Sequence, residues 1–213
     1  MAYRHVLDGI RVLDFTQFIA GPACTRLMAE MGADVIKLEH APGGDLCRGL
    51  PVVRDGRSGY FVQHNQGKRS VCLDMRTEAG KAVIRDLVAW ADVVVENFRP
   101  GALEKWGLSY DQLSKDHPEL ILARVSGFGQ TGPYSLRAGY ALVGEAMGGL
   151  RYITGEPDRA PARAGISVGD SLSGLHAALG VMMALHAVKT TGKGQVVDVA
   201  IYESVLSVME NLV

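Results

Sequence analysis

Short hydrophobic runs alternate along the chain with stretches whose hydrophobic positions recur at helical spacing. Five runs are rich in β-branched residues, at 10–15, 34–39, 70–74, 92–98 and 120–126, and a sixth lies within GQVVDVAIYE. Near-continuous runs of this kind predict strands that are buried on both faces, as in parallel sheets. The sixth run leads into a last helix at the end of the sequence.

Helices are predicted between the strands. The segment GPACTRLMAEMG has Pro22 near its first turn and Gly32 at its stop. Thr77 caps EAGKAVIRDLVAWA, whose hydrophobic residues fall on one face, and a strong helix is predicted from Asp170 to about Thr190. Strands that alternate with helices predict right-handed crossovers, so the expected fold class is α/β with a doubly wound parallel sheet.

Ligands of such sheets bind outside the carboxyl ends of the strands. The strand ends to inspect are therefore residues 16–20, 39–40, 96–99 and 126–140. Two segments rich in Gly, Pro and Arg, residues 42–58 and 155–169, are predicted to be long loops, and such loops are often functional.

Composition narrows the functional classes. The 213 residues carry a formal net charge of -1, which argues against nucleic-acid or anionic-membrane binding. The three cysteines have no metal or disulfide spacing and the six histidines have no metal-ligand spacing, so we expect a reducing compartment and no metal. The N-terminus does not resemble a signal peptide, and LHAALGVMMALHAV is interpreted as a buried helix too short to span a bilayer. A cytoplasmic location follows.

The stretch GFGQTG at residues 127–132 has the letters of a dinucleotide-binding fingerprint. A true fingerprint joins the first strand to a helix, whereas this one follows a late strand and is followed at once by Pro133. We therefore interpret it as a flexible loop at a strand end.

The polar candidates leave alternatives open. Asp170 is either a helix N-cap or a carboxylate nucleophile at a helix start. Asn97 and Phe98 offer amide hydrogen bonds and an aromatic face to a ligand, or they are a strand cap and a core side chain. Basic residues gather in loops and at strand ends, as solvated charges or as a phosphate site: Arg48, Arg54, Arg57, Lys68, Arg69, Arg76, Arg99, Lys105, Arg137, Arg159 and Arg163.

Several motifs occur together in order along the whole chain. They are LDGIRVLDFTQFIAGPACTRLMAEMGADVIKLE, NQGKRSVCLD, DVVVENFRPGALEKWGLSYDQL, GFGQTGPY, AGY and GDSLSGLHAALG followed by TGKGQVVDVAIYE. This set resembles the class III CoA-transferase family, which also contains acyl-CoA racemases. The resemblance implies that residues 1–213 are the N-terminal part of a large Rossmann-like domain, without the family's small second domain. It also implies an interlocked homodimer, with an acyl-CoA and a free carboxylic acid as substrates and no permanently bound cofactor.

The resemblance also implies roles for single residues. Asp170 matches the family's nucleophile, which forms an aspartyl anhydride and then an aspartyl-CoA thioester. CoA-binding positions carry over to Ile19, Ala20, His40, Leu73, Arg76, Asn97, Phe98, Arg99, Lys105, Arg137 and Tyr140. At His40, relatives often have arginine.

Tyr140 bears on the choice of reaction. The racemases that resemble this chain have histidine there, as a partner to the aspartate in proton exchange, and a phenol of pKa near 10 suits that role poorly. Transfer is therefore favoured, with a racemase or a CoA-binding domain without activity as the alternatives. The stretch GEAMGGLRYITGEPDRAPARAGISVGDSL looks closest to transferases that use succinyl-CoA and a small dicarboxylate. Arg151, Arg159 and Arg163 then pair the second carboxylate, or they are a charged loop surface.

Overall fold

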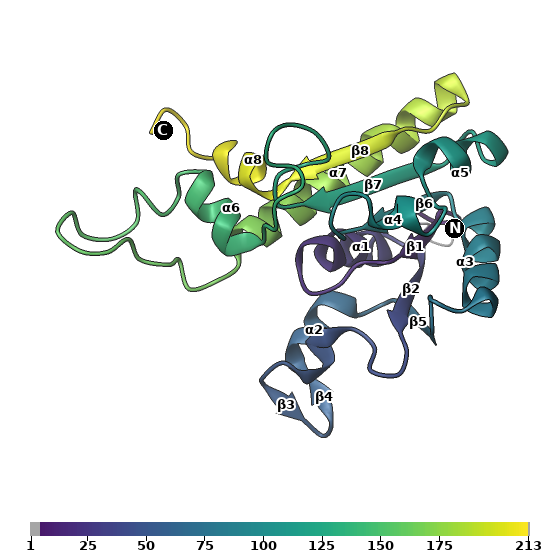
Figure 1. Cartoon of the computed structure of the whole chain (residues 1–213), viewed down its shortest axis with the longest axis horizontal. Coiled ribbons are helices and arrows are strands. Elements are labelled where there is room, and N and C mark those ends of the chain that lie inside the picture. Colours follow the sequence, from purple (N-terminus) through teal and green to yellow (C-terminus); the bar gives the residue numbers. More distant parts are fainter. Residues whose placement is uncertain (1–4, 213) are drawn as a thin grey trace.

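The computed structural model describes residues 5–212 and contains one six-stranded sheet in the order β5-β2-β1-β6-β7-β8 (Figure 1). Its strands are β1 Arg11–Asp14, β2 Asp34–His40, β5 Arg69–Leu73, β6 Val93–Glu96, β7 Ile121–Ser126 and β8 Val196–Ala200. Every neighbouring pair is parallel. All six strands predicted from the hydrophobic runs are present, and the α/β doubly wound fold class is confirmed.

The helices confirm the longer predictions only. They are α1 Ala20–Glu30, α2 Gly59–Asn65, α3 Glu78–Trp90, α4 Ala102–Lys105, α5 Tyr110–Asp116, α6 Ala141–Met147, α7 Val168–Thr191 and α8 Ile201–Leu206. The sequence predicted α1, α3, α7 and the last helix. It missed α2, α5 and α6, because helices of about two turns show little periodicity, whereas a helix carrying Lys105 was also predicted and is present as α4.

Each face of the sheet has its own hydrophobic core. Cys24 and Met28 of α1 pack with Val181 of α7 against one face, and α3, α4 and α5 cover the other. Consecutive strand residues point to opposite faces, so Val12 enters the first core and Leu13 the second. This explains why the strands are continuous hydrophobic runs in the sequence.

The segment 42–58, predicted to be a loop, is partly ordered. It contains the 3₁₀ helix η1 Leu46–Gly49 and a hairpin of β3 Val53–Arg54 and β4 Arg57–Ser58. Asp55 and Gly56 at its turn have φ values of 50° and 72°. An Asp-Gly pair with positive φ at both positions is a strong hairpin signal, and the sequence analysis overlooked it.

The second predicted loop is longer than expected, because the chain between α6 and α7 runs without helix or strand and projects from the body (Figure 1). Helix α7 starts at Val168, so Ser167 is the N-cap residue and Asp170 lies inside the first turn. The N-cap alternative for Asp170 is therefore wrong.

Helix α7 is also longer than predicted. Among residues 5–212 it is the one helix long and apolar enough to cross a membrane by length and composition, a test that core helices also pass. Val181 and Ala184 are buried, whereas Leu175, Leu179 and Met183 are exposed. The predicted helix from Asp170 to about Thr190 is thus confirmed, its interpretation as buried holds for one face only, and the expectation that its apolar run is too short to span a bilayer does not hold for the whole helix.

Buried charges fix the end of β1. Lys68 Nζ donates to Asp14 Oδ2 at 2.9 Å, and the hydroxyls of Thr16 and Thr25 donate to the same carboxylate. Burial alone would raise the pKa of Asp14, but the charges of Lys68 and Lys37 hold it well below its ordinary value. Lys68 is therefore not the solvated loop cation or phosphate ligand that the sequence analysis considered, because its side chain is 2% exposed.

We expect Lys68→Met to lower the free energy of unfolding at pH 7 by about 3–5 kcal/mol, because it leaves the Asp14 carboxylate buried without its main cation. The deficit should narrow in acid below about pH 4, where aspartate is ordinarily protonated. Urea denaturation across pH measures both effects. Lys81→Met, which breaks the surface pair with Glu78, is the control and should cost about 1 kcal/mol or less. Equal losses in the two variants would contradict the role of the buried pair.

Candidate functional site

The parallel arrangement places the carboxyl ends of all six strands at one edge of the sheet. Strands lie about 4.8 Å apart, so the distance along this edge from β5 to β7 is roughly 20 Å. His40 and Leu73 are register partners at the β2–β5 end of the edge, and Asn97 follows β6. The edge is therefore long enough for an extended ligand.

A cavity of about 530 Å³ lies near the β6–β7–β8 part of this edge. Its walls come from the residues after β1, from the residue after β6, from the start of α6, from the loop before α7 and from α8. The lining residues are Phe18, Ile19, Ala20, Asn97, Val125, Gly139, Tyr140, Ala141, Leu142, Arg163, Ser167, Asp170 and Ile201. Five of the twelve site residues predicted from the sequence meet here: Ile19, Ala20, Asn97, Tyr140 and Asp170.

Close helix packing brings the starts of α1 and α7 together. Gly174 of α7 lies so near α1 that a Cβ atom there would be 2.7 Å from the Ala23 Cβ and 2.8 Å from the Ala20 carbonyl oxygen. Any larger side chain would push the two helices apart. Asp170, one turn before Gly174, is thus held opposite the N-terminus of α1, where free backbone N–H groups favour negative charge.

Side chains bind the backbone of Thr16 and Gln17 and the N–H of Phe18, between β1 and α1. Asn97 Oδ1 accepts from the Gln17 N–H at 2.8 Å, and Asn97 Nδ2 donates to the Gln17 carbonyl oxygen at 2.8 Å. Asp45 accepts from the Phe18 N–H at 3.3 Å, while Lys37 Nζ donates to the Thr16 carbonyl at 2.6 Å and pairs with Asp45 at 3.0 Å.

These contacts constrain Phe18, whose φ of 62° lies in the left-handed region. Strained residues of this kind cluster at ligand sites. The two hydrogen bonds to Gln17 also change the interpretation of Asn97, whose amide was a candidate to contact a ligand. Both of its ends bind the chain itself, so Asn97 fixes a cavity wall.

Asp170 is the titratable group with the most altered environment in the cavity. Burial raises its pKa to about 6, the negative charge of Glu145 adds to the rise, and Arg163 opposes it. A carboxylate with this pKa is mostly ionised at neutral pH yet more basic than an ordinary aspartate. It is therefore able to act as a nucleophile or as a base.

Gly127, the first glycine of the 127–132 stretch, allows a close backbone contact with Gly139. A Cβ on Gly127 would be 2.5 Å from the Gly139 Cα, so the two ends of the loop touch. Gln130 N–H donates to Asp198 Oδ2 at 2.9 Å, which ties the loop to β8. The expectation of a flexible loop is therefore corrected to a pinned loop that delivers Tyr140 to the cavity.

The remaining predicted residues lie outside this cavity. Arg76 is exposed and paired with Asp74 at 2.9 Å, near the half-buried His40 and Leu73. Phe98 packs edge-on against Phe15 and Trp106 in the second core, as the core alternative expected. Arg99 and Lys105 are exposed, and Arg137 is exposed and stacks on the Tyr134 ring with 4.1 Å between its guanidinium carbon and the ring centre.

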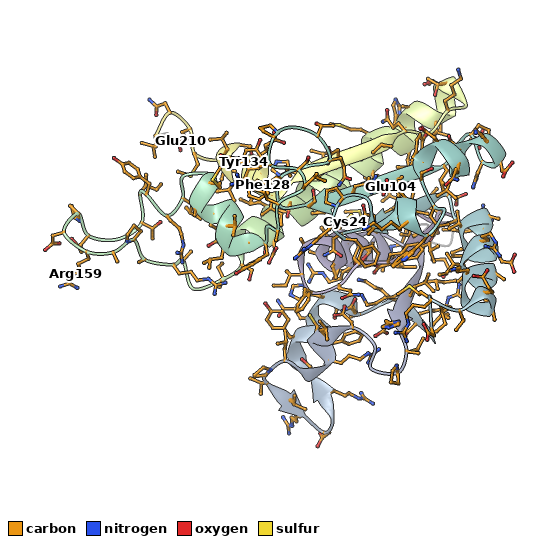
Figure 2. All side chains as sticks on the ribbon, viewed as in Figure 1. Cys24, Glu104, Phe128, Tyr134, Arg159 and Glu210 are labelled. Atoms are coloured by element: carbon orange, nitrogen blue, oxygen red, sulfur yellow. The ribbon has the colours of Figure 1, made fainter. Side chains whose placement is uncertain are left out.

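The three arginines proposed for a second carboxylate separate in space. Arg163 lines the cavity with Asp170, whereas Arg159 lies at the far end of the projecting loop (Figure 2). Arg151 is half-buried after α6. Of the three, the cavity geometry favours Arg163 alone.

The sequence analysis missed two buried acids that shape the site. Asp45 lies in a segment predicted to be a loop, and Glu145 lies in a helix that was not predicted. Both are buried, at 2% and 0% exposure. Charged residues are seldom buried without a partner, but burial of an acid leaves no signal in a single sequence.

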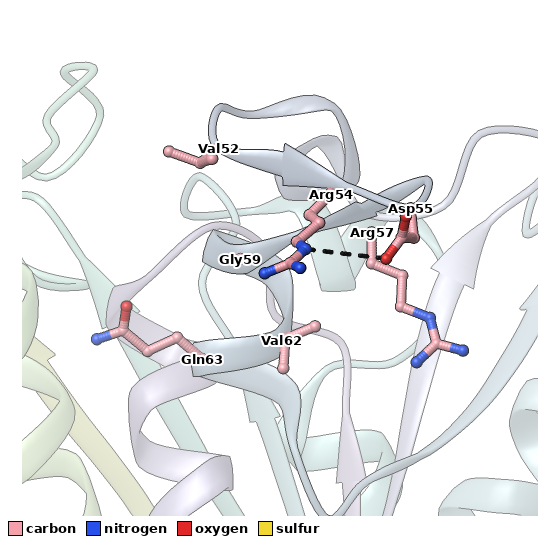
Figure 3. A pocket seen from close by; sticks show the side chains of 7 residues that line it. All are labelled: Val52, Arg54, Asp55, Arg57, Gly59, Val62 and Gln63. Carbon is pink, nitrogen blue, oxygen red and sulfur yellow. Dashed lines mark ion pairs between the residues drawn. The ribbon is translucent and has the colours of Figure 1, made fainter.

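A larger depression of about 680 Å³ lies against the β3–β4 hairpin and α2 (Figure 3). Val52, Arg54, Asp55 and Arg57 line it, and the side chains of Arg54 and Asp55 are 93% and 92% exposed. It shares no residue with the cavity at Asp170. Wide exposure makes it a surface hollow with no water-excluding wall.

The fold and the cavity define a class of protein: a doubly wound α/β domain with an activated carboxylate at the carboxyl edge of its sheet. Comparison with protein families makes the class specific. Residues 7–213 match CoA-transferase family III, and the chain belongs to that family.

Relatives and solved structures agree with this assignment. The chain is 50% identical over 208 residues to succinyl-CoA–D-citramalate CoA-transferase of Chloroflexus aurantiacus, covering 97% of this chain and 52% of that enzyme. It is 44% identical to formyl-CoA:oxalate CoA-transferase of Streptomyces avermitilis, covering 94% and 49%. A CAIB/BAIF family protein from Brucella suis superposes with a TM-score of 0.93 at 42% identity, covering 98% and 56%. The chain thus spans about half the length of the curated relatives it matches.

We expect Asp170→Asn to raise the free energy of unfolding at pH 7 by about 3 kcal/mol. A folded pKa of about 6, above the ordinary 3.8, means that stability falls as pH rises from about 4 to about 6, and the neutral amide removes this loss. The gain should therefore vanish below about pH 4. Thermal or urea unfolding across pH tests it, with the exposed Asp86→Asn as control. A gain that is independent of pH would contradict the raised pKa.

Proposed function

We propose that this chain carries the acyl-transfer site of a CoA-transferase, which moves CoA from an acyl-CoA to a small carboxylic or dicarboxylic acid. The observation that carries the proposal is the half-buried carboxylate of Asp170, whose pKa is raised, facing the N-terminus of α1 across the strand-end cavity. The family assignment supports it, and the relatives include enzymes named for succinyl-CoA and a dicarboxylate. Succinyl-CoA is accordingly the proposed donor.

The proposed reaction keeps an activated acyl bond, either an anhydride or a thioester, at every stage. The Asp170 carboxylate attacks the thioester carbonyl, the C–S bond breaks, and CoA thiolate leaves a mixed anhydride on Asp170. The thiolate then attacks the aspartyl carbonyl, releasing the donor acid and leaving an aspartyl-CoA thioester. The acceptor carboxylate attacks this thioester to give a second anhydride and free thiolate. Attack of the thiolate on the acceptor acyl carbon forms the new acyl-CoA and regenerates Asp170.

The cavity supplies what this chemistry requires. A carboxylate is a weak nucleophile, so orientation and oxyanion stabilisation must lower much of the barrier. The N-terminus of α1 presents unpaired backbone N–H groups beside Ile19 and Ala20, which lie across the cavity from Asp170. We propose that they receive negative charge during acyl transfer.

The CoA moiety is proposed to lie along the carboxyl edge of the sheet. Ile19, Ala20 and Tyr140 border the reaction cavity, and His40, Leu73 and Arg76 lie at the β2–β5 end of the edge. Arg99, Lys105 and Arg137 complete the proposed CoA-binding set, while Asn97 fixes the wall between and Phe98 supports that wall from the core. Arg163 is the proposed partner for a second carboxylate on the donor or the acceptor.

The proposed substrates need no resident cofactor, and no group of three metal-binding side chains occurs among residues 5–212. Free thiols at Cys24, Cys47 and Cys72 fit a reducing, cytoplasmic location. We also propose that the described residues form the N-terminal part of a large domain, because they build a six-stranded sheet with a core on each face.

Incubation with succinyl-CoA should leave a covalent acyl or CoA adduct on Asp170, detected by mass spectrometry of the intact chain and its peptides. Asp170→Asn should abolish the adduct, because an amide cannot attack the thioester. Asp86→Asn, which changes an exposed helical aspartate, should retain it. Transfer to a second acid is then followed with a panel of dicarboxylates.

Other outcomes assign the site differently. Transfer that persists in Asp170→Asn would contradict the nucleophile. Exchange of the α-proton in deuterated water without transfer would favour a racemase, against which Tyr140 stands. Binding of CoA with neither reaction would favour a CoA-binding domain without activity.

A homodimer is the proposed assembly. The outer face of α7 exposes Leu175, Leu179 and Met183, one turn apart, and such a stripe is expected to be covered by protein. Light scattering should give twice the 22.8 kDa chain mass. Leu179→Lys should shift the chain toward monomer, whereas Val83→Lys on α3 should not. A wild-type monomer at micromolar concentration would contradict the proposal.

A further inference from the structure

Glu145 is a buried carboxyl group without a charge partner. It lies on α6 with 0% of its surface exposed. Its Oε1 accepts one long hydrogen bond, from the Gly169 N–H at 3.5 Å, and its Oε2 has no hydrogen-bond partner within the described part of the chain. A buried carboxylate in this state costs several kcal/mol in an ordinary core. Its presence beside the cavity therefore calls for a functional reason.

The position of Glu145 links it to Asp170. Helix α6 packs against both α7 and α8 near the start of α7 (Figure 1). Gly169, which donates to Glu145, directly precedes Asp170 in the first turn of α7. A Cβ at Gly169 would lie 3.0 Å from Ile201 Cγ2 and 3.4 Å from the Ala141 carbonyl oxygen, so α6 and α8 close around this turn. Glu145 thus supports the turn from behind, while Asp170 faces the cavity.

We infer that Glu145 is a positioning residue for Asp170: it holds the first turn of α7 and, through its charge, sets how strongly the Asp170 carboxylate attacks. The inference rests on the proposed function, because it concerns the same nucleophile. The negative charge of Glu145 destabilises a second negative charge on Asp170. The Asp170 carboxylate is therefore more basic and donates an electron pair to an electrophile more readily. A basic carboxylate attacks a thioester carbonyl faster than an ordinary aspartate.

Few other charges compete for this pair. Helix α8 carries Glu203, which is exposed and accepts from the Tyr202 hydroxyl. Arg151 follows α6, and its backbone N–H donates to the Glu145 carbonyl at 3.4 Å, but its guanidinium makes no ion pair within 4 Å among residues 5–212.

On the cavity side, α1 presents only the uncharged Ile19 and Ala20 to Asp170. Arg163 is the opposing cation, since its charge lowers the pKa of Asp170 whereas burial and Glu145 raise it. The electrostatic environment of Asp170 is therefore set by the negative charge of Glu145, behind the first turn of α7, and by the positive charge of Arg163, on the cavity side.

Glu145→Gln tests the inference, because glutamine keeps the shape and the oxygen that accepts from Gly169 but removes the charge. Selective ¹³C labelling of aspartate carboxyls gives the Asp170 titration directly, with Asp170→Asn assigning its signal. We expect the midpoint to fall from about 6 toward the ordinary 3.8 by half a pH unit or more. Arg163→Gln should move it upward, and Glu203→Gln should leave it unchanged.

Single-turnover mass spectrometry with succinyl-CoA at pH 8, where Asp170 is ionised in all variants, gives the chemical consequence. Adduct formation in Glu145→Gln should slow roughly threefold for each pH unit of lowered midpoint, taking a Brønsted slope near 0.5 as for thiolates. Circular dichroism verifies the fold of each variant.

The outcomes separate the two proposals. An unchanged Asp170 midpoint and adduct rate in a folded Glu145→Gln would overturn the inference while leaving the nucleophile in place. Absence of an adduct on Asp170 in the wild-type chain would overturn the proposed function, and with it the role of Glu145 in attack, even where the midpoint shifts. A shifted midpoint together with a slower adduct supports both.

Discussion

The site depends on the charged groups buried at the junction between β1 and α1. Asp14 and Lys68 fix the last residue of the central strand, and Lys37 and Asp45 hold the backbone that follows it. None of these four side chains is more than 2% exposed. Ion pairs so deeply buried are weak sources of stability, because desolvation offsets their attraction. Their contribution here is geometric, because hydrophobic side chains of equal volume could not form hydrogen bonds with the backbone N–H and C=O groups.

These hydrogen bonds to the backbone determine where α1 starts, and the start of α1 determines where α7 can lie. Gly174 allows α7 to pack closely against α1. Asp170 then lies at the cavity, in the first turn of a helix whose later turns pack in the core. The Asp170 carboxylate, whose pKa is raised mainly by burial, is therefore supported by two helices that pack in the same core. Asp170 and Glu145 both sit where they oppose folding to some degree, as residues at catalytic sites commonly do.

The hydrophobic pattern was sufficient for the sheet, because the inner strands β1, β2, β6 and β7 are buried on both faces and appear as hydrophobic runs, while the edge strands β5 and β8 are more exposed. It was also sufficient for α1 and α3, whose caps and breakers flank clear periodicity. It failed for α6, which has 7 residues, and for the hairpin, whose Asp55-Gly56 signal is short. For the site, strand-end reasoning pointed to the edge at which the cavity lies, and the resemblance supplied Asp170. Neither source showed that both ends of the Asn97 amide bind Gln17, nor that Lys68 is buried. Pairings between residues 80 positions apart in the chain leave no trace in a single sequence.

The contact between Gly127 and Gly139 separates the intervening residues 128–138 from Tyr140, which directly follows them at the cavity. Because the backbones meet there, the residues between them form a closed excursion whose ends are already joined, as in an Ω-loop. Residues 128–138 do not line the cavity, so their length and composition, Arg137 excepted, can vary while the joined ends keep Tyr140 in place. This excursion is thus a module that evolution or design can exchange, leaving Asp170 where it is.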